Sequence, residues 1–236
     1  MNKTMIKSAS SSLSMHEAAC SKSHSQAHRD CPTQLAIFPL PIFLLPSGIT
    51  RLRIFEPRYL TMISTSSDGR GFVIATCDKG TEAQLPKWGA RVQVVDFHTD
   101  NGVLVIDVQA VHLVSLGDTK RQNDGLLIAD VQYLDHWATL EKPAAGGCSL
   151  EIQAHQHPSE QMNALVHVLK KIVSQHSLLS NVYQNLYLAS PQWVCARFLE
   201  ILPLSLNEKE KFIEPRALEH IQSFLFTLVL GSEIYN

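Results

Sequence analysis

The stretch from Phe38 to Ile63 constrains the fold of this chain most. It reads FPLPIFLLPSGITRLRIFEPRYLTMI. Its first half is apolar but is broken by Pro39 and Pro41, which cannot donate hydrogen bonds within a sheet and therefore belong at a strand start, an edge or a bulge. The sequence predicts a buried strand over residues 35–45 with an irregular edge near the two prolines.

A turn and a helix are expected directly after this strand. Pro46, Ser47 and Gly48 combine a fixed φ with a residue that is free to adopt positive φ, which predicts a tight corner. Pro57 suits the first position of a helix, because its missing N–H would have no partner there. The helix that begins at Pro57 should bury Tyr59.

Composition limits the classes of function. The 236 residues are 45% hydrophobic and 18% charged, with a formal net charge of −2, which indicates a folded globular chain. Its 20 basic residues are dispersed along the sequence, singly or in pairs such as Lys170-Lys171, whereas a nucleic-acid-binding surface gathers Lys and Arg on one face. The longest apolar run, residues 35–46, is too short and too rich in proline to span a bilayer. We expect neither nucleic acid nor a membrane as a partner.

The five cysteines are odd in number and form no CxxC pair, which argues against a disulfide framework and favours a reducing, cytoplasmic location. Residues 1–33 are rich in Ser and His, and we expect a flexible tail there. Within it His16, Cys20, His24 and His28 recur every four residues and could present Zn-type ligands on one helix face. Because serine is a poor helix former, an unstructured tail is favoured over a metal site, and we expect no cofactor.

Alternation of apolar and polar residues predicts strands at residues 72–77, 90–97, 103–116 and 126–134. Asp100-Asn101-Gly102 is typical of a hairpin turn, and the Asn-Asp-Gly sequence at residues 123–125 indicates a second turn. Because these strands follow one another through short connections without helices, they predict an antiparallel sheet that curls into a barrel.

The pattern becomes helical after residue 141. A breaker cluster at residues 143–147 is followed by apolar residues at helical spacing from Met162 to Val173. Asn207 is expected as the N-cap of a short helix over residues 206–212. Other helices are expected at residues 181–188, 191–202 and 214–230. The predicted order of parts is a flexible tail (1–33), a β-barrel subdomain (34–140), a linker (141–157) and a helical subdomain (158–236).

Two separated segments carry a resemblance to a known family. Residues 38–63 resemble the opening signature of the Lon N-terminal domain, and WVCARFLEILPLSLNEKEKFIE, residues 193–214, is similar to its helical part. The resemblance covers residues 35–230 and implies an α+β fold in which a PUA-like antiparallel β pseudo-barrel precedes a C-terminal helical bundle. It also implies a stand-alone bacterial protein that binds unfolded or extended polypeptide segments without ATP. The chain departs from the family pattern at residues 109–113, where QAVHL replaces the usual Gly and Arg-rich turn.

The sequence carries no GK[ST] motif for nucleotide binding and no recognisable nucleophile-base arrangement, so we expect a binding module and not an enzyme. Polypeptide could bind by adding a strand at the edge near residues 38–43, or in an apolar groove between barrel and helices. The candidate contact residues are Phe43, Leu44, Phe55, Arg58 and Trp88.

Simpler roles exist for some of these residues. Glu56, Arg58 and Tyr59 are explained equally by helix capping, a salt bridge to the barrel and core packing. Trp88, expected in a loop, is either a lid over the core or an exposed anchor for a partner. Two other functions stay open: an adaptor whose helices dock on a Lon-type protease, and a PUA-like RNA-binding protein, which the dispersed charge disfavours.

Overall fold

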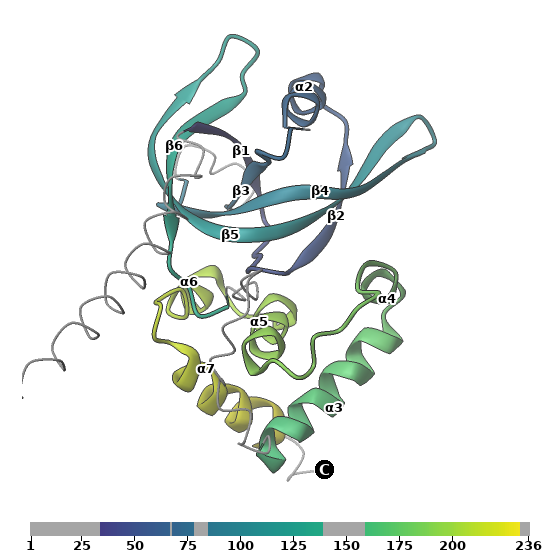
Figure 1. Cartoon of the computed structure of the whole chain (residues 1–236), viewed down its shortest axis with the longest axis vertical. Coiled ribbons are helices and arrows are strands. Elements are labelled where there is room, and N and C mark those ends of the chain that lie inside the picture. The colour runs from purple at the N-terminus through teal and green to yellow at the C-terminus, as the bar shows by residue number, and fades with distance from the viewer. Residues whose placement is uncertain (1–33, 67, 78–84, 139–158, 232–236) are drawn as a thin grey trace, which may run out of the picture.

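The structure is a computed structural model that describes residues 34–66, 68–77, 85–138 and 159–231. The expected tail with its His and Cys residues, and nearly all of the expected linker, lie outside these residues. The strands are β1 (Gln34–Leu40), β2 (Ile49–Ile54), β3 (Phe72–Thr76), β4 (Trp88–Asp100), β5 (Val103–Arg121) and β6 (Leu127–Leu134) (Figure 1). The helices are α2 (Pro57–Thr65), α3 (Glu160–Gln175), α4 (Ser177–Val182), α5 (Pro191–Ile201), α6 (Leu206–Glu210) and α7 (Leu218–Leu225), which continues into the π-helical turn η1 (Phe226–Leu230).

The six strands form one mixed sheet in the order β2-β5-β4-β3-β1-β6, and it closes on itself because β5 also pairs with β6. The expectation of a purely antiparallel sheet is wrong at one position: β1 and β3 run parallel. The chain between them contains β2 and α2, and such a long connection brings it back to the starting end of β1, as parallel pairing requires. The chain is therefore an α+β protein with a closed, mixed sheet.

β1 lies between β6 and β3, but its two pairings overlap only at Ile37: it pairs with β6 over Gln34–Ile37 and with β3 over Ile37–Leu40. Among the described strands, residues 38–40 therefore have a partner on one side only, which is compatible with the irregular edge expected near the two prolines. The expected strand over residues 35–45 ends at Leu40, and residues 41–48 form an irregular segment that leads to β2. Ser47 adopts a φ of 65°, and Gly48 N donates to Leu45 O at 2.9 Å, which confirms the tight corner.

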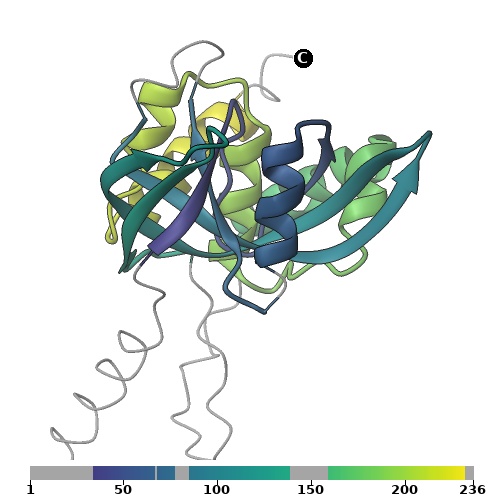
Figure 2. The same cartoon turned by 90° about the horizontal axis from the view of Figure 1, so that it is seen from above.

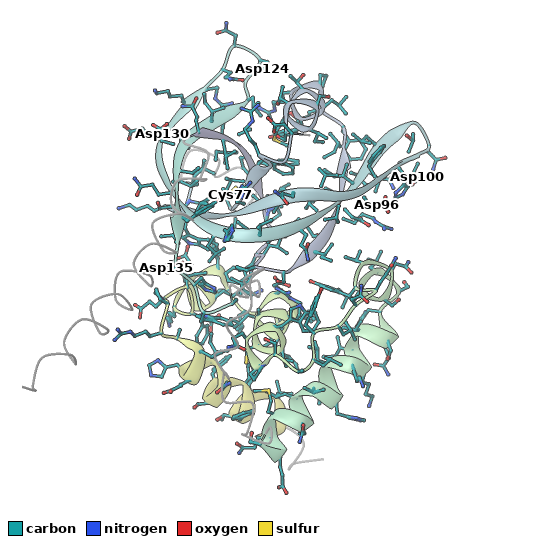
Figure 3. The ribbon with its side chains drawn as sticks, in the orientation of Figure 1. Cys77, Asp96, Asp100, Asp124, Asp130 and Asp135 are labelled. Atoms are coloured by element: carbon teal, nitrogen blue, oxygen red, sulfur yellow. The ribbon has the colours of Figure 1, made fainter. Side chains whose placement is uncertain are left out.

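Two long hairpins extend from the barrel in different directions, β5–β6 at the top of Figure 1 and β4–β5 at its right, and Figure 2 shows the β4–β5 hairpin from above. The β4–β5 turn has Asn101 and Gly102 at positive φ, as predicted from the sequence. Asp100 lies at its tip, and Asp124 lies at the tip of the β5–β6 hairpin (Figure 3). Trp88 is the first residue of β4 and does not lie in a loop, which corrects the expected placement.

The C-terminal half is helical, with two shifts from the expected boundaries. The helix expected at residues 181–188 is found earlier, as α4, and residues 183–190 are irregular. Ser205, not Asn207, caps α6, because the Ser205 hydroxyl accepts the Glu208 N–H while the Glu208 carboxylate accepts the Ser205 N–H. α5 is confirmed almost to the residue, with Ser190 as its N-cap and Pro191 at its start.

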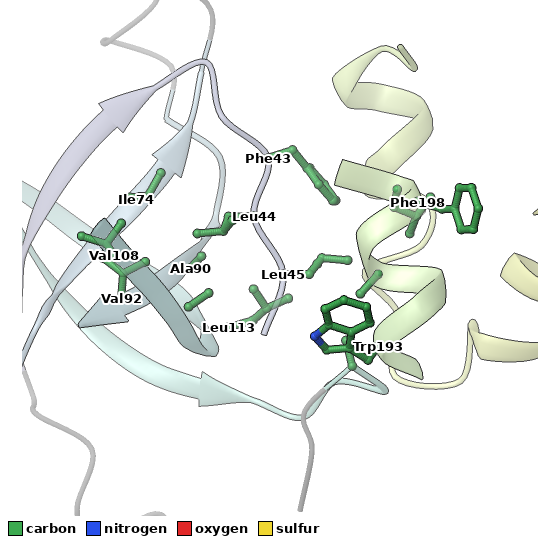
Figure 4. Close-up of a cluster of buried hydrophobic side chains, with 14 of the residues drawn as sticks. Phe43, Leu44, Leu45, Ile74, Ala90, Val92, Val108, Leu113, Trp193 and Phe198 are labelled. Carbon is green, nitrogen blue, oxygen red and sulfur yellow. The ribbon is translucent and has the colours of Figure 1, made fainter. Parts of the chain in front are cut away.

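One hydrophobic core joins the barrel to the helices. α2 covers one end of the barrel, and α3 to α7 lie at the opposite end (Figure 1). α5 is apolar on nearly all sides and is the most buried helix, with seven consecutive buried residues from Trp193 to Leu199. Phe43 and Leu45 of the irregular segment lie between the barrel side chains and those of α5 (Figure 4). The residues that connect β1 to β2 therefore attach the two halves to each other.

Candidate functional site

The irregular segment of residues 41–48 is held by α5 through its backbone as well as its side chains. Leu45, which is fully buried, donates its N–H to Glu200 Oε1 at 2.8 Å. On the barrel side, Ser47 N donates to Ala110 O at 2.8 Å. Each half of the protein thus satisfies backbone groups of this one segment, which fixes its path across the junction.

Arg197 is the central cation of the junction. Only 1% of its surface is exposed. Its Nη2 donates to Glu200 Oε1 at 2.7 Å and to the carbonyl oxygens of Leu45 and Pro46 at 3.3 and 3.2 Å. The guanidinium also lies against the ring of Trp193, with 5.4 Å between its central carbon and the ring centroid. A charge this deeply buried requires a counter-ion, and Glu200 supplies it.

Glu200 joins the same network from the other side. Its Oε2 accepts a long hydrogen bond from the Tyr183 hydroxyl at 3.4 Å, and that hydroxyl in turn accepts the Ile49 N–H at 3.0 Å. Burial raises the pKa of the Glu200 carboxyl, while Arg197 and the Leu45 N–H oppose that rise. Gly48 is required beside it, because an added Cβ would collide with Glu200 Oε1.

Three hollows follow the junction between barrel and helices. The first, of about 420 Å³, contains Lys209 and is called the Lys209 hollow. The second, of about 380 Å³, contains Tyr183 and shares Ile42, Phe43 and Glu200 with the first. The third, of about 550 Å³, lies between the β4–β5 hairpin, β2 and α4, and shares Ile49, Thr50, Leu178 and Leu179 with the second. Because neighbouring hollows share walls, we call the three together the seam groove.

The second and third hollows have mainly apolar walls, whereas the Lys209 hollow is more polar. Leu178 on α4 is 74% exposed and forms part of the rim of two hollows. Arg51 makes a bidentate pair with Asp107 at 2.7 Å, and Arg53 pairs with Asp100 at 2.7 Å. An occupant of the third hollow would therefore meet apolar side chains beside neutralised charges.

Two of the five candidate residues line the seam groove. Phe43 lines the first and second hollows and Leu44 lines the second. Both are largely buried, at 8% and 3% exposure, so they form its floor. Trp88 is 9% exposed, packs edge-on against Phe43 and donates Nε1–H to Glu210 Oε1 at 3.1 Å. Of the two roles considered for Trp88, its burial matches the lid over the core.

The other two candidates lie elsewhere. Phe55 is 68% exposed and lies between β2 and α2, at the end of the barrel away from α5. Arg58 pairs with Glu56 at 2.7 Å and donates to Gly125 O of the β5–β6 turn at 3.1 Å. Tyr59 is buried in the core, as its simpler role requires. Glu56 occupies the N-cap position of α2 but its side chain makes no capping hydrogen bond. Among the described residues, Arg58 reaches the barrel by a hydrogen bond and not by a salt bridge.

The residues that build the junction were not found from the sequence. Arg197 and Glu200 stand three positions apart in the apolar segment WVCARFLEI, and charges within such a segment were an available signal. Lys209 gave no such signal, because it stands in the charged run NEKEK. Leu178 was also missed, because exposure of a leucine cannot be read from its neighbours in sequence.

Further observations limit the chemistry of this part of the chain. Among the described residues, no three His, Cys, Asp or Glu side chains come together as they would to hold a metal ion. Cys77 and Cys195 are both buried, and burial raises the pKa of the Cys195 thiol to about 12. Of the helices described, none is long and apolar enough to cross a membrane.

Comparison with solved structures finds the same fold in two Lon proteins. The Lon N-terminal domain protein from Xanthomonas campestris is 24% identical with a TM-score of 0.56, and the match covers 81% of this chain and 98% of that one. The N-terminal domain of the Mycobacterium avium complex Lon protease is 13% identical with a TM-score of 0.52, covering 81% of this chain and 95% of the other. Comparison with curated proteins finds no significant sequence match.

Comparison with protein families identifies the chain directly. The family model of the ATP-dependent protease La (Lon) substrate-binding domain matches residues 34–219, which include the barrel, α3 to α6 and the start of α7. The resemblance noted at residues 38–63 and 193–214 is thereby confirmed. The chain belongs to the Lon substrate-binding domain family.

Proposed function

We propose that this chain binds extended, apolar segments of other polypeptides in the seam groove and catalyses no reaction itself. The observation that carries the proposal is a row of three hollows that share lining residues, two of them mainly apolar, whose charged residues at the β4–β5 hairpin are already paired. A polypeptide could bury apolar side chains there without stranding any of those charges. Membership of a substrate-binding family supports the same type of ligand.

The candidate contacts acquire different roles in this proposal. Phe43 and Leu44 form the floor of the groove, and Leu178 supplies an exposed apolar contact at its rim. Phe55 is exposed enough to contact a long polypeptide that continues past the barrel, with Arg58 nearby on α2. Trp88 acts indirectly, because its ring packs edge-on against the Phe43 ring.

The remaining parts of the proposal concern setting and architecture. The closed sheet followed by α3, α5 and α7 packed together supports a PUA-like pseudo-barrel with a C-terminal helical bundle. The free thiol of the buried Cys195 suits a reducing, cytoplasmic compartment. The high pKa of Cys195 keeps that thiol protonated, which suits a non-catalytic role.

Fluorescence anisotropy with a dye-labelled, unstructured peptide carrying Leu at alternate positions tests the groove. Leu178→Asp should weaken binding about tenfold or more, because an ionised carboxylate would face the apolar occupant. The fold should survive, because Leu178 is 74% exposed. Phe43→Asp is unsuitable, since Phe43 is buried between Trp88 and Lys209 and its loss would destabilise the fold itself.

Leu60→Asp is the matched control, because Leu60 is also an exposed helical leucine, at 40% exposure, but lies on α2 away from the groove. Equal affinities for wild type, Leu178→Asp and Leu60→Asp would contradict the proposed site. Retention of RNA in place of peptide, lost after nuclease treatment, would contradict the proposed class of ligand.

A further inference from the structure

Lys209 is a buried cation at one end of the seam groove. It is 8% exposed, yet its side chain lines the Lys209 hollow. Its Nζ donates to the Glu200 carbonyl oxygen at 3.2 Å and lies 5.3 Å from the centroid of the Phe43 ring. An ammonium has three N–H donors. Within the described part of the chain, the Glu200 carbonyl oxygen is the acceptor found for them.

The nearby carboxylates serve other donors. Glu200 uses Oε1 for Arg197 and the Leu45 N–H, as described above. On α6, the Glu208 carboxylate accepts from Ser205, at 2.6 Å from the hydroxyl.

Glu210, the next carboxylate along, accepts from Trp88. None of the ion pairs between described residues includes Lys209.

One hydrogen bond to a neutral carbonyl oxygen does not replace the hydration that a buried ammonium loses. The carbonyl contact and the aromatic face offset part of its lost hydration, because each places negative charge density near the cation. Neither supplies the full counter-charge that a buried ion requires. Burial lowers the pKa of Lys209, the nearby charge of Glu200 opposes part of that lowering, and a bound anion would raise the pKa further.

We propose that the Lys209 hollow binds a carboxylate of the polypeptide that occupies the seam groove. This rests on the proposed function and specifies the chemistry that one end of the occupant must carry. The hollow has a volume of about 420 Å³, and its wall combines apolar side chains (Ile42, Phe43, Leu204 and Leu206) with the polar residues Thr76, Glu200 and Ser205. It therefore suits a carboxylate that is attached to apolar atoms, either a free C-terminus or an acidic side chain.

The test compares peptides that differ only in that charge. One peptide of fixed sequence is prepared with a free C-terminal carboxylate and as the C-terminal amide. A second pair, both amidated, carries Asp or Asn at an internal position. Wild-type protein should bind one of the two carboxylate forms about tenfold more tightly than its neutral counterpart, because a charge-assisted hydrogen bond replaces a neutral one. The pair that shows the preference identifies the source of the carboxylate.

Lys209→Met should abolish that preference by lowering the affinity for the carboxylate peptide to that of its neutral counterpart, because Met keeps an apolar contact with Phe43 and removes the charge. A purely structural role for Lys209 would lower both affinities together. Lys211→Met is the matched control on an exposed lysine two residues away, and it should keep the preference. Lys209→Arg retains the cation and should also keep it, which covers the case in which the Met variant does not fold.

Equal affinity of wild-type protein for the charged and neutral members of both pairs would overturn this inference and leave the proposed function intact. Absence of binding by all four peptides would overturn both. A preference that survives in Lys209→Met would show that another residue recognises the carboxylate and would overturn the assignment to Lys209.

Discussion

Replacing Arg197 with Met removes the cation on which the junction depends. Glu200 would stay buried without its counter-ion, and the carbonyl oxygens of Leu45 and Pro46 would lose a donor. Removing one partner of a buried ion pair costs about 3–5 kcal/mol. With a urea dependence of about 2 kcal/mol per molar, the unfolding midpoint should fall by about 2 M.

The cost should depend on pH. Burial raises the folded-state pKa of Glu200 above its ordinary value of 4.5, and Arg197 opposes that rise. A raised carboxyl pKa means that folding loses free energy as pH increases from 4.5 through the folded pKa, since the folded state must then hold a buried anion. Without Arg197 that pKa rises further, so the variant loses more stability at neutral pH. The difference in unfolding free energy between wild type and Arg197→Met should shrink as the solution is acidified toward pH 4.5.

Urea unfolding followed by tryptophan fluorescence at several pH values measures both effects, because Trp193 lies against the Arg197 guanidinium. Arg53→Met is the matched control: it breaks an ion pair with Asp100 in which both side chains are more than 40% exposed. That pair should contribute at most about 1 kcal/mol. The assignment of Arg197 as the buried cation of the junction would be refuted if Arg197→Met lost no more unfolding free energy than Arg53→Met. It would also be refuted if the loss in Arg197→Met did not change with pH.

Two further predictions concern buried positions near the junction. Burial lowers the pKa of His136 to about 4, and its Nδ1 accepts the Ala138 N–H, so the folded state holds the neutral ring. Stability should therefore fall as pH decreases from about 6.5 to about 4, by up to about 3 kcal/mol, and thermal unfolding of His136→Asn should show a flatter profile over that range. Gly48→Ala should cost about 2 kcal/mol in urea unfolding, because the new methyl group collides with Glu200 Oε1, and an unchanged midpoint would show that Glu200 can move aside.

Local patterns predicted most of the elements correctly. α5 begins with Ser190 and Pro191, whose capping hydroxyl and missing N–H act within one turn of helix. The β4–β5 hairpin turns at Asn101 and Gly102, where positive φ is needed whatever surrounds the turn. In both cases the physical cause lies within a few residues, so it is visible in the sequence.

The errors came from causes that act over longer distances. Trp88 was expected in a loop because Pro86 and Gly89 surround it, yet pairing of β4 with β5 extends the strand to include it. The strand expected over residues 35–45 ends at Leu40, and closure of the barrel places it between β3 and β6, with residues 38–40 paired to β3 alone. Asn207 is a good N-cap residue, but Ser205 has the Glu three positions later that completes a reciprocal cap.

By itself, the sequence determined which residues are apolar, where the chain turns and where most helices begin, and two of its segments pointed to the correct family. Only the tertiary structure decided the parallel pairing of β1 with β3, the seam groove and the isolation of Lys209. These features depend on distant contacts: Leu45 and Glu200, which hold the junction together, are 155 positions apart. The type of a residue limits which interactions it can make, but its burial and its partners depend on distant parts of the chain that pack against it.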